Sequence, residues 1–311
     1  MGKVEDISVL SLFSGLGAYE KALEKIGIGF NVVGYCEKDS ATAKCYSVIH
    51  GVDSSMNLSD VSKIVPSELP DFDLLTFSPP CQDISAIGQH AGVHGGTRTS
   101  LMWKCLDIIR TKMPKYLVME NVRTLAGRYA DSLYEFMSII RGMGYICEAK
   151  VLSAADYGLP QDRKRLFMVG VRNDLGHFFI WPDPVPLRKR LSDMIDPGEP
   201  IVTINKDVAH TIRLGGRRSG VGNRHNWDGY MVNGKEYFLS AKDCLVLMGF
   251  DASDFEKLSE NGVSKSKICK IAGNSVAVSV LEHLLKSLLL PSGNGSLFSA
   301  NDGERHRDET R

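Results

Sequence analysis

One cysteine of the chain stands in a setting that suits a nucleophile. Cys81 follows two consecutive prolines, Pro79 and Pro80, and precedes Gln82. Because proline rings fix the backbone φ, the pair holds the next residue on a rigid corner, and rigid placement favours nucleophilic catalysis. A single cysteine in an intracellular protein is also often an inert, buried, small apolar residue. From the residue alone both interpretations stay open.

A polar stretch, residues 83–100, follows this corner and holds 4 glycines. Unstructured loops of this length are uncommon in compact domains and often act as lids over a site. The stretch is therefore a candidate lid, with a flexible surface excursion as the alternative.

A carboxylate and two guanidinium groups could supply acid catalysis and anion binding. Glu120 follows the apolar run 116–119, where burial would raise its pKa and let it act as an acid. Arg163 and Arg165 come directly before the apolar run 166–171, and alternation along a strand would put both on one side. Together they could bind phosphate or polarise a carbonyl group. Each of the three side chains could instead form an ordinary salt bridge.

A glycine-containing turn and an acidic residue downstream of it suggest nucleotide binding. The turn at residues 13–17 contains Gly15 and Gly17, which let the backbone bend sharply and approach a ligand. Glu37 comes roughly 20 residues later, the spacing at which an acidic side chain accepts hydrogen bonds from ribose hydroxyls. Either feature alone is also common in purely structural turns and at helix starts. Together they predict a pocket for an adenosine-containing cofactor.

The elements that would position these residues alternate between strand-like and helix-like segments. This alternation predicts an α/β fold in which a mostly parallel sheet has helices on both faces. In such a sheet the carboxyl ends of the strands form the ligand crevice. Strands are expected at residues 7–13, 31–36, 73–77, 116–119, 146–152 and 166–171, and helices at 19–26, 41–49, 101–111, 132–143, 240–248 and 276–289.

The composition changes after residue 172, which indicates a second domain. Prolines and glycines cluster between residues 173 and 235, and helical periodicity is lost there. We expect a small, irregular domain at 173–271, inserted between the two parts, 1–172 and 272–290, of a catalytic and cofactor-binding domain. The tail, residues 291–311, is rich in glycine, serine and charge and is expected to be disordered.

Charge and cysteine content limit the class of protein. The 311 residues include 37 basic and 37 acidic side chains, so no global field favours nucleic acid, although a local basic surface would suffice. The 7 cysteines include no Cys-x-x-Cys pair, so neither disulfides nor a metal site is expected. Without a signal-peptide pattern or an apolar run of about 18 residues, we expect no membrane span and a reducing, cytoplasmic setting.

Taken in order along the chain, seven segments resemble the cytosine-C5 DNA methyltransferase family of prokaryotic and phage type. The resemblance covers about residues 7–289, and it implies a Rossmann-like, S-adenosylmethionine-dependent methyltransferase sheet with a small target-recognition domain. Its most specific elements are Pro-Cys-Gln and Glu-Asn-Val. The segments are Phe13-Ser14-Gly15-Leu16-Gly17, Glu37-Lys38-Asp39, Asp60, Pro79-Pro80-Cys81-Gln82, Glu120-Asn121-Val122, Gln161-x-Arg163-x-Arg165 and Gly273-Asn274-Ser275-Val276.

The resemblance implies a reaction and a role for each catalytic candidate. A methyl group would pass from S-adenosylmethionine to C5 of a cytosine flipped out of double-stranded DNA in a specific sequence. Cys81 would attack C6 as a thiolate, since the thiol is a poor nucleophile. Glu120 would hold or protonate N3. Arg165 would contact the base carbonyl oxygen, and Arg163 would support the cysteine and the backbone.

The same resemblance assigns the cofactor pocket. Glu37 would take the ribose hydroxyls, and Asp60 the adenine amine; by itself Asp60 is typical of an ordinary helix cap. The lining would consist of Phe13, Gly15, Gly17, Glu37, Asp60, Pro80, Leu101, Asn274, Ser275 and Val276.

Residues 209–224 have the composition of a DNA-contacting loop, with 4 arginines, 4 glycines and no acidic residue. Flexible arginines suit guanine edges and phosphates; a solvated loop that serves solubility is the alternative. A monomer is expected, and a restriction endonuclease acting on the same site is a partner that the resemblance allows. The DNA-binding candidates are Gln82, Arg213, Arg217, Arg218 and Arg224.

The chain departs from the family pattern at two places. Ala18 follows Gly17 where paired glycines are frequent, a small change that should still fit. Where the family usually has Arg-x-Leu-Thr, the chain has Tyr-Phe-Leu-Ser at 237–240. The missing arginine puts in doubt how the recognition region is supported, but not the chemistry.

Three other functions are alternatives to DNA methylation. A branch of the family that methylates transfer RNA would share the catalytic residues, but its usual Cys-Phe-Thr tripeptide is absent. A catalytically inactive nucleic-acid-binding relative is disfavoured by the intact Cys81, Glu120 and Arg165. A nucleotide-binding oxidoreductase would explain only the glycine turn.

Overall fold

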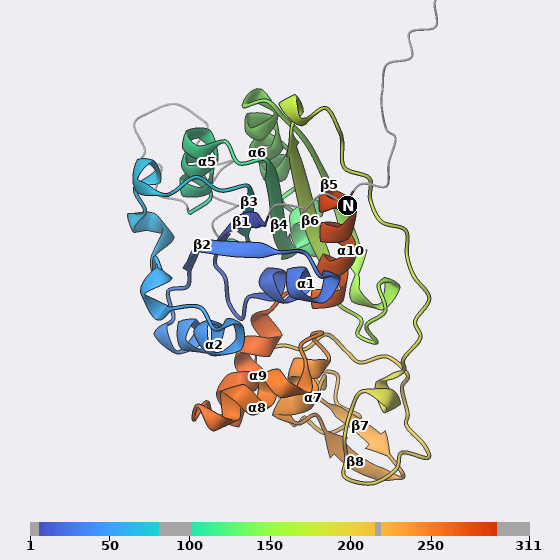
Figure 1. The fold of residues 1–311 in the computed structure, drawn as a ribbon. Coiled ribbons are helices and arrows are strands. Elements are labelled where there is room, and N and C mark those ends of the chain that lie inside the picture. Colours follow the sequence, from blue (N-terminus) through green and yellow to red (C-terminus); the bar gives the residue numbers. More distant parts are fainter. Residues whose placement is uncertain (1–5, 81–100, 215–218, 291–311) are drawn as a thin grey trace, which may run out of the picture.

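The structure, a computed structural model, describes residues 6–80, 101–214 and 219–290 (Figure 1). Its main sheet has 6 strands in the order β2-β1-β3-β4-β6-β5, and β1 to β4 are parallel to one another. The α/β fold with a mostly parallel sheet, predicted from the sequence, is confirmed. The strands are β1 (Ile7–Leu12), β2 (Phe30–Cys36), β3 (Leu74–Phe77), β4 (Tyr116–Val122), β5 (Tyr145–Ser153) and β6 (Lys164–Arg172).

One strand, β6, runs antiparallel to both of its neighbours. It follows β5 after a connection of 10 residues, 154–163, that contains no α-helix, whereas a parallel neighbour requires a longer crossover, usually helical. The pairing with β6 also lengthens β4 beyond the predicted residues 116–119, so that Glu120 lies opposite Phe167 within the ladder. The start of β6 therefore lies at the same edge as the carboxyl ends of β1, β3 and β4.

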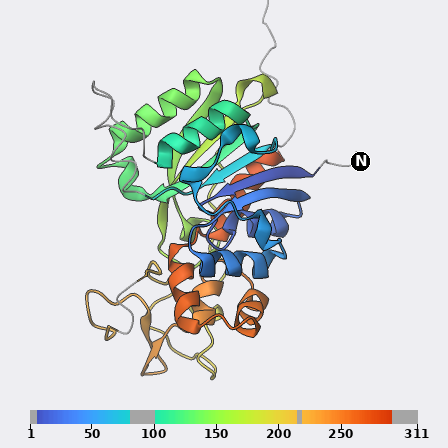
Figure 2. The same cartoon turned by 90° about the vertical axis from the view of Figure 1, so that its left-hand side faces the viewer.

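Helices cover both faces of the sheet (Figures 1 and 2). Alternation along the strands supplies both cores, because Val9 faces one layer and Leu10 the other. Helices α1 and α10 pack on the first face, and α5 and α6 on the second. The helices of this part are α1 (Ala18–Ile26), α2 (Ser40–His50), α5 (Leu101–Lys112), α6 (Ala130–Gly142) and α10 (Val278–Leu289).

The segment between β6 and α10 has more regular structure than the sequence predicts. An Asn233-Gly234 turn, with φ of 49° and 77°, joins the two strands of a hairpin, as such dipeptides favour. Helices α8 and α9 are short and were not predicted, although α9 buries Ile268, Cys269, Ile271 and Ala272 on one face. The elements are β7 (Gly229–Val232), β8 (Lys235–Phe238), α7 (Ala241–Val246), α8 (Ala252–Glu260) and α9 (Lys265–Asn274).

The apolar core of this segment is continuous with that of the sheet. Trp227 and Tyr230 are fully buried and belong to the same cluster as α1 and α10. From the sequence, the polar stretch 225–228 beside the arginine-rich loop predicts an aromatic group, Trp227, near the DNA; this prediction is wrong, because the Trp227 ring is part of the core.

Polar contacts tie helix α8 and its C-terminal end to the sheet part of the molecule. The buried Lys21 of α1 lies 3.1 Å from the buried Asp254 of α8. Lys257 Nζ donates to the Ile49 carbonyl at 3.3 Å, and Lys44 Nζ donates to the carbonyl of Asn261 at 3.1 Å. Helix α8 is thus fixed against α1 and α2.

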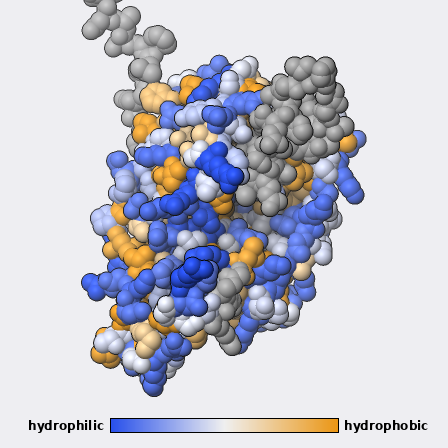
Figure 3. All heavy atoms as spheres, turned by 180° about the vertical axis from the view of Figure 1, so that it is seen from behind, coloured by the Kyte–Doolittle hydropathy of each residue, from blue (hydrophilic) through white to orange (hydrophobic). Residues whose placement is uncertain are grey.

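Across the part of the chain that is described, no single helix is long and apolar enough to cross a membrane. Only α9 and α10 taken together pass that test by length and composition, across a bend of 43°. Figure 3 shows the face opposite to that of Figure 1, where hydrophilic side chains predominate and hydrophobic ones are scattered among them.

Candidate active site

A cavity of about 540 Å³ lies at the carboxyl edge of the parallel strands. The turns after β1, β2 and β3 form one part of its wall, and the end of β4 and the start of β6 form another. Helix α9, from the C-terminal part of the sequence, closes the cavity. Its lining includes Phe13, Ser14, Gly15, Leu16, Ala18, Tyr19, Glu37, Asp39, Thr42, Ser78, Pro79, Pro80, Glu120, Asn121, Val122, Arg163, Arg165, Lys267, Lys270, Ile271, Gly273, Asn274, Ser275 and Val276.

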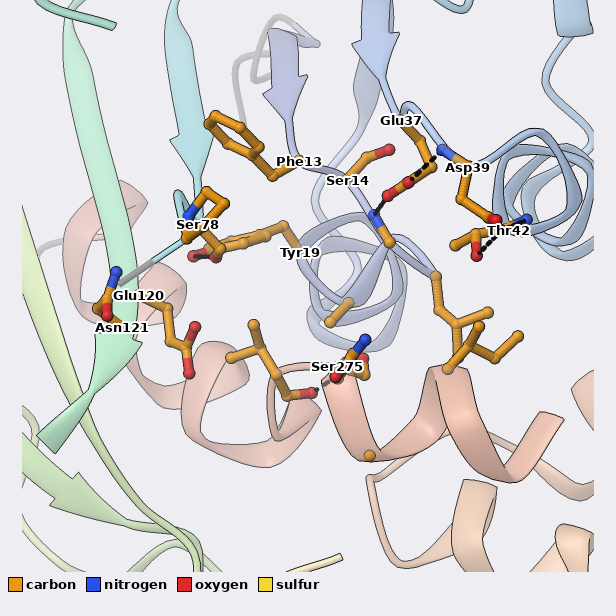
Figure 4. Close-up of a pocket in the computed structure, with 18 of the residues that line it drawn as sticks. Phe13, Ser14, Tyr19, Glu37, Asp39, Thr42, Ser78, Glu120, Asn121 and Ser275 are labelled. Carbon is orange, nitrogen blue, oxygen red and sulfur yellow. Dashed lines mark hydrogen bonds between the residues drawn. The ribbon is translucent and has the colours of Figure 1, made fainter. Parts of the chain in front are cut away.

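The turn after β1 bends because three of its residues adopt positive φ, Phe13 at 54°, Gly15 at 55° and Gly17 at 73°. The N–H of Gly15 donates to Glu37 Oε2 at 3.1 Å, and the N–H of Asp39 donates to Glu37 Oε1 at 2.9 Å (Figure 4). Because a carboxylate accepts about four hydrogen bonds, Glu37 retains capacity for hydroxyl groups of a ligand.

The second glycine of the turn acts on packing. Gly17 has a φ of 73°, and a Cβ there would lie 2.2 Å from Nε2 of His50. That ring nitrogen is hydrogen-bonded to the carbonyl of Leu16 at 2.8 Å. Gly17 therefore does not line the cavity. Its lack of a side chain makes room for His50 of α2, which is hydrogen-bonded to the turn at Leu16.

The donors and acceptors around the turn fit a nucleoside-containing cofactor. The Ser14 hydroxyl is buried, and no hydrogen-bond partner for it exists among the described residues. Glu37 supplies acceptors nearby, while Phe13 and Val276 supply apolar surface. Figure 4 shows Glu37 and Asp39 at one end of the cavity and Glu120 and Asn121 at the other.

The end formed by β4 and β6 holds a carboxylate between positive charges. Glu120 Oε1 lies 3.2 Å from Nε of Arg165, and Glu120 is only 9% exposed. Burial raises the pKa of the Glu120 carboxyl, and the charges of Arg165 and Arg163 oppose that rise without cancelling it. The carboxyl is thus poised to carry a proton closer to neutral pH than an exposed glutamate.

Arg163 is buried and bonds to main-chain carbonyls. Its guanidinium donates to Ile212 O at 3.1 Å, Gly273 O at 3.1 Å and Ser275 O at 2.5 Å. Burial, and then the charge of Arg165, lower the pKa of Arg163 to about 9. The described contacts make Arg163 a support of the backbone, which is half of the expectation; its relation to Cys81 lies outside the described residues.

The corner before Cys81 is held from β4. The side-chain amide of Asn121 donates to the carbonyl of Pro79 at 2.8 Å, and its own oxygen accepts from the N–H of Val122 at 2.9 Å. Cys81 and Gln82 fall outside the described residues, as does the candidate lid. Through the Asn121–Pro79 bond, strand β4 sets the direction in which the chain leaves β3.

A family model described as C-5 cytosine-specific DNA methylase matches residues 7–208, more than half of the chain. The chain belongs to this family. The resemblance noted in the sequence is thereby confirmed, and the methyl donor of these enzymes is S-adenosylmethionine, as expected.

Individual relatives agree with this assignment. The type II methyltransferase M.HhaI of Haemophilus parahaemolyticus is 30% identical, over 88% of this chain and 92% of that protein. The orphan methyltransferase M.SPRI of Bacillus phage SPR is 39% identical over 56% of this chain, but the chain spans only 39% of that relative's length. Among solved structures, the S. pombe Dnmt2 methyltransferase shares the fold, with a TM-score of 0.70, 20% identity, and coverage of 92% of this chain and 99% of that one.

In this member of the C5 methylase family, the structure brings most of the predicted cofactor residues to the cavity. Besides Gly17, two do not line it. Asp60 accepts from the Ser62 N–H at 3.0 Å and pairs with Lys38 at 2.9 Å, and this ion pair and the Ser62 bonds lower its pKa to about 2. Leu101 begins α5 and packs against the core of the second face. Those that line the cavity are Phe13, Gly15, Glu37, Pro80, Asn274, Ser275 and Val276.

Sequence reasoning missed polar residues of the lining. The hydroxyl groups of Tyr19 and Ser78 lie 3.4 Å apart, and Ser78 is close enough to Glu120 to affect its pKa. Burial raises the pKa of Tyr19 above its usual range. From α9, Lys267 reaches Asp39 in an ion pair. The position of Ser78 beside the proline pair is the one signal that could have identified it.

The candidate DNA-binding arginines are only partly described. Arg213 and Arg224 are exposed, and Arg224 Nε donates to His225 Nε2 at 3.0 Å. Arg217 and Arg218 lie outside the described residues. In the described parts of the chain no group of three or more His, Cys, Asp or Glu side chains could hold a metal ion.

Proposed function

We propose that the protein transfers a methyl group from S-adenosylmethionine to C5 of a cytosine flipped out of double-stranded DNA. The observation that carries the proposal is the Glu120–Arg165 pair, which shares one cavity with the Glu37 turn in a chain of the C5 methylase family. Attack on the cytosine ring pushes negative charge into it. A carboxyl group with a raised pKa beside a guanidinium can stabilise that charge.

The proposed chemistry starts at Cys81. Its thiolate forms a bond to C6, and the ring electrons move toward C5 and N3. Glu120 stabilises this charge by a proton or hydrogen bond at N3, and Arg165 by contact with the carbonyl oxygen. When bound, S-adenosylmethionine would supply an electrophilic methyl group, which C5 would take as the sulfonium S–CH3 bond breaks and S-adenosylhomocysteine leaves. Solvent water would then accept the C5 proton. The electrons of the C5–H bond would re-form the C5–C6 double bond and expel the Cys81 thiolate, and the N3 proton would return to Glu120.

The target base must leave the duplex, because C6 lies inside the base stack. Unstacking costs a few kcal/mol. We propose that the arginines of residues 209–224 and Gln82 contact the DNA and help to offset this cost. Replacement of Arg217 and Arg218 by alanine should weaken binding and reduce the salt slope by about one for each lost phosphate contact. Lys63→Ala, on the sheet part of the molecule, is the control and should keep the salt slope of the wild type.

We propose cofactor roles for the seven predicted residues that line the cavity. Glu37 would accept the ribose hydroxyls, with Ser14 as a further polar partner. Gly17 would act indirectly through the shape of the turn. The adenine role expected of Asp60 would use the acceptor capacity that its carboxylate retains beside the bonds from Lys38 and Ser62.

We retain the division into a catalytic part, 1–172 and 272–290, and a recognition part, 173–271, as a proposal. Helix α9 would be shared, because Lys267 and Lys270 line the cavity although they precede residue 272. Tyr237 takes part in supporting the recognition part without the family's arginine: its hydroxyl donates to the Asp243 carboxylate and lies 3.2 Å from the carbonyl oxygen of Asp196.

DNA is favoured over transfer RNA, since the matching family model is one of DNA methylases. The names of type II and orphan methyltransferases among the relatives support a prokaryotic or phage setting, in the cytoplasm, with or without a restriction endonuclease. We propose a monomer. The intact Glu120–Arg165 pair argues against an inactive relative.

Bisulfite sequencing of DNA from cells that express the chain tests the substrate and identifies the site. A duplex carrying 5-fluorocytosine at that site should then form a covalent adduct at Cys81 in the presence of cofactor. Cys81→Ser should abolish methyl transfer and leave cofactor binding nearly intact. If the DNA stayed unmodified and transfer RNA were methylated instead, transfer RNA would be the substrate in place of DNA.

A further inference from the structure

A short segment of the proposed recognition part, residues 209–214, lies directly against the cavity wall; we call it the rim segment. It contacts helix α9 at Gly273, which lines the cavity. A Cβ on Gly273 would lie 2.8 Å from the carbonyl carbon of Arg213, 2.9 Å from its oxygen and 3.2 Å from the N–H nitrogen of Leu214. These atoms are backbone, so no side-chain rotation could make room.

Hydrogen bonds from the loop before β6 hold the rim segment in this place. The side-chain oxygen of Gln161 accepts from the N–H of Ile212 at 3.2 Å, while its amide donates to Leu247 O at 2.6 Å. Arg163 donates to Ile212 O from the same loop and also to Gly273 O. Gln161 is fully buried and Arg163 is 3% exposed, so water does not compete for these bonds.

The main chain adds two more bonds at the start of the rim segment. Ala209 N donates to Pro160 O at 2.8 Å, and Asp162 N donates to Ala209 O at 2.8 Å. The segment is therefore bonded to the β5–β6 loop and in close contact with α9 at Gly273. Its depth against the cavity is set by the absence of a side chain at position 273.

We propose that Gly273 is a positioning residue for the DNA substrate: it seats the rim segment against the cavity wall and so fixes where Arg213 meets the DNA. The inference rests on the proposed function. Positioning of this kind is sensitive, because displacement of about 1 Å can reduce catalysis about a hundredfold.

Gly142 is a matched control that distinguishes loss of the rim-segment contact from an effect on helix stability. Gly273 and Gly142 both lie in the last turn of a helix, and neither has a positive φ. A Cβ on Gly142 would meet nothing within 4 Å. Alanine favours a helix over glycine, so Gly142→Ala should be neutral or stabilising, whereas Gly273→Ala must displace the backbone of Arg213.

The test compares the two variants in steady-state methylation, in DNA binding by fluorescence anisotropy and in binding of S-adenosylhomocysteine by calorimetry. Gly273→Ala should raise both KM and Kd for DNA at least about tenfold, while the Kd for S-adenosylhomocysteine changes less than threefold. Gly142→Ala should match the wild type in all three. Unchanged DNA constants in Gly273→Ala, or a larger loss of cofactor binding than of DNA binding, would overturn the proposal.

If Gly273→Ala does not fold, the variant Thr211→Val tests the same seating role. The half-buried Thr211 donates its hydroxyl to the carbonyl of Asp162, and valine keeps its shape while removing that bond from the rim segment. A rise in KM for DNA with unchanged cofactor binding is expected, and no rise would contradict the seating role. If the wild type methylates no DNA, the proposed function fails; if it does and the variants behave like it, only the inference fails.

Discussion

Glu120 and Arg165 are diagonal neighbours across an antiparallel strand pair. Arg165 lies opposite Val122, and Glu120 lies opposite Phe167, so the two side chains share one face of the sheet. Their charged atoms are 3.2 Å apart at the edge where the chain before Cys81 leaves β3. The reversed direction of β6 is what brings a guanidinium to a carboxyl that the parallel strands present.

Replacement of Glu120 by glutamine should depress kcat by at least about a hundredfold, the scale of acid–base contributions. The amide keeps the shape and a hydrogen bond but cannot carry the proton that offsets charge at N3. KM for DNA should change only a few-fold, because the charge develops in the transition state. Steady-state rates over a range of DNA concentrations check this, and an effect on KM alone would reassign Glu120 to binding.

Removal of the Ser78 hydroxyl should move the pH dependence of kcat. Burial raises the Glu120 pKa, and the Ser78 hydroxyl works against that rise. In Ser78→Ala the pKa should therefore rise further, the protonated carboxyl should persist to higher pH, and the alkaline limb of the kcat profile should shift upward. Ser78→Thr, which keeps a hydroxyl, should retain the wild-type profile. A limb that stays in place or moves to lower pH in Ser78→Ala contradicts the relation.

Two glycines with similar backbone angles should respond differently to alanine. Gly17 has a φ of 73° and would meet His50, whereas Gly51 has a φ of 66° and nothing within 4 Å. The left-handed conformation alone costs about 1–2 kcal/mol, so Gly51→Ala should lose about that much stability. Gly17→Ala should lose more and should also weaken cofactor binding, because the displaced His50 supports the turn. Urea unfolding and calorimetry measure the two effects; equal losses would remove the packing explanation.

The buried pair Lys21–Asp254 should be strongly coupled. Lys21→Met leaves the Asp254 carboxylate buried without this partner, which should cost roughly 3–5 kcal/mol of unfolding free energy. Asn at 254 can still accept the α8 capping bond from Asp251 N, so the double variant Lys21→Met, Asp254→Asn should recover part of that loss. A double-mutant cycle from urea denaturation gives the coupling energy. Additive losses would mean that the two charges do not depend on each other.

Much of the sheet could be predicted, because its signals are local. Alternating apolar residues mark β1 and the neighbouring strands, and the Gly15 turn with Glu37 marks the pocket behind them. Helices α8 and α9 were not predicted, because each is only 9 or 10 residues long and follows a segment in which prolines and glycines hide the helical pattern. The burial of Trp227 was also missed, since an aromatic residue in a polar stretch gives no sign of which core it will join.

For this member of the C5 methylase family, the amino-acid order alone predicted the rigid Pro79–Pro80 corner, the acid candidate Glu120 and the edge of the sheet at which both lie. Turns and strand ends depend on neighbours in sequence. Tertiary structure alone decided that α9 completes the cavity and that the carbonyls of Ile212, Gly273 and Ser275 converge on Arg163. Contacts between residues so far apart in the chain follow from how whole elements pack, and no local pattern records that packing.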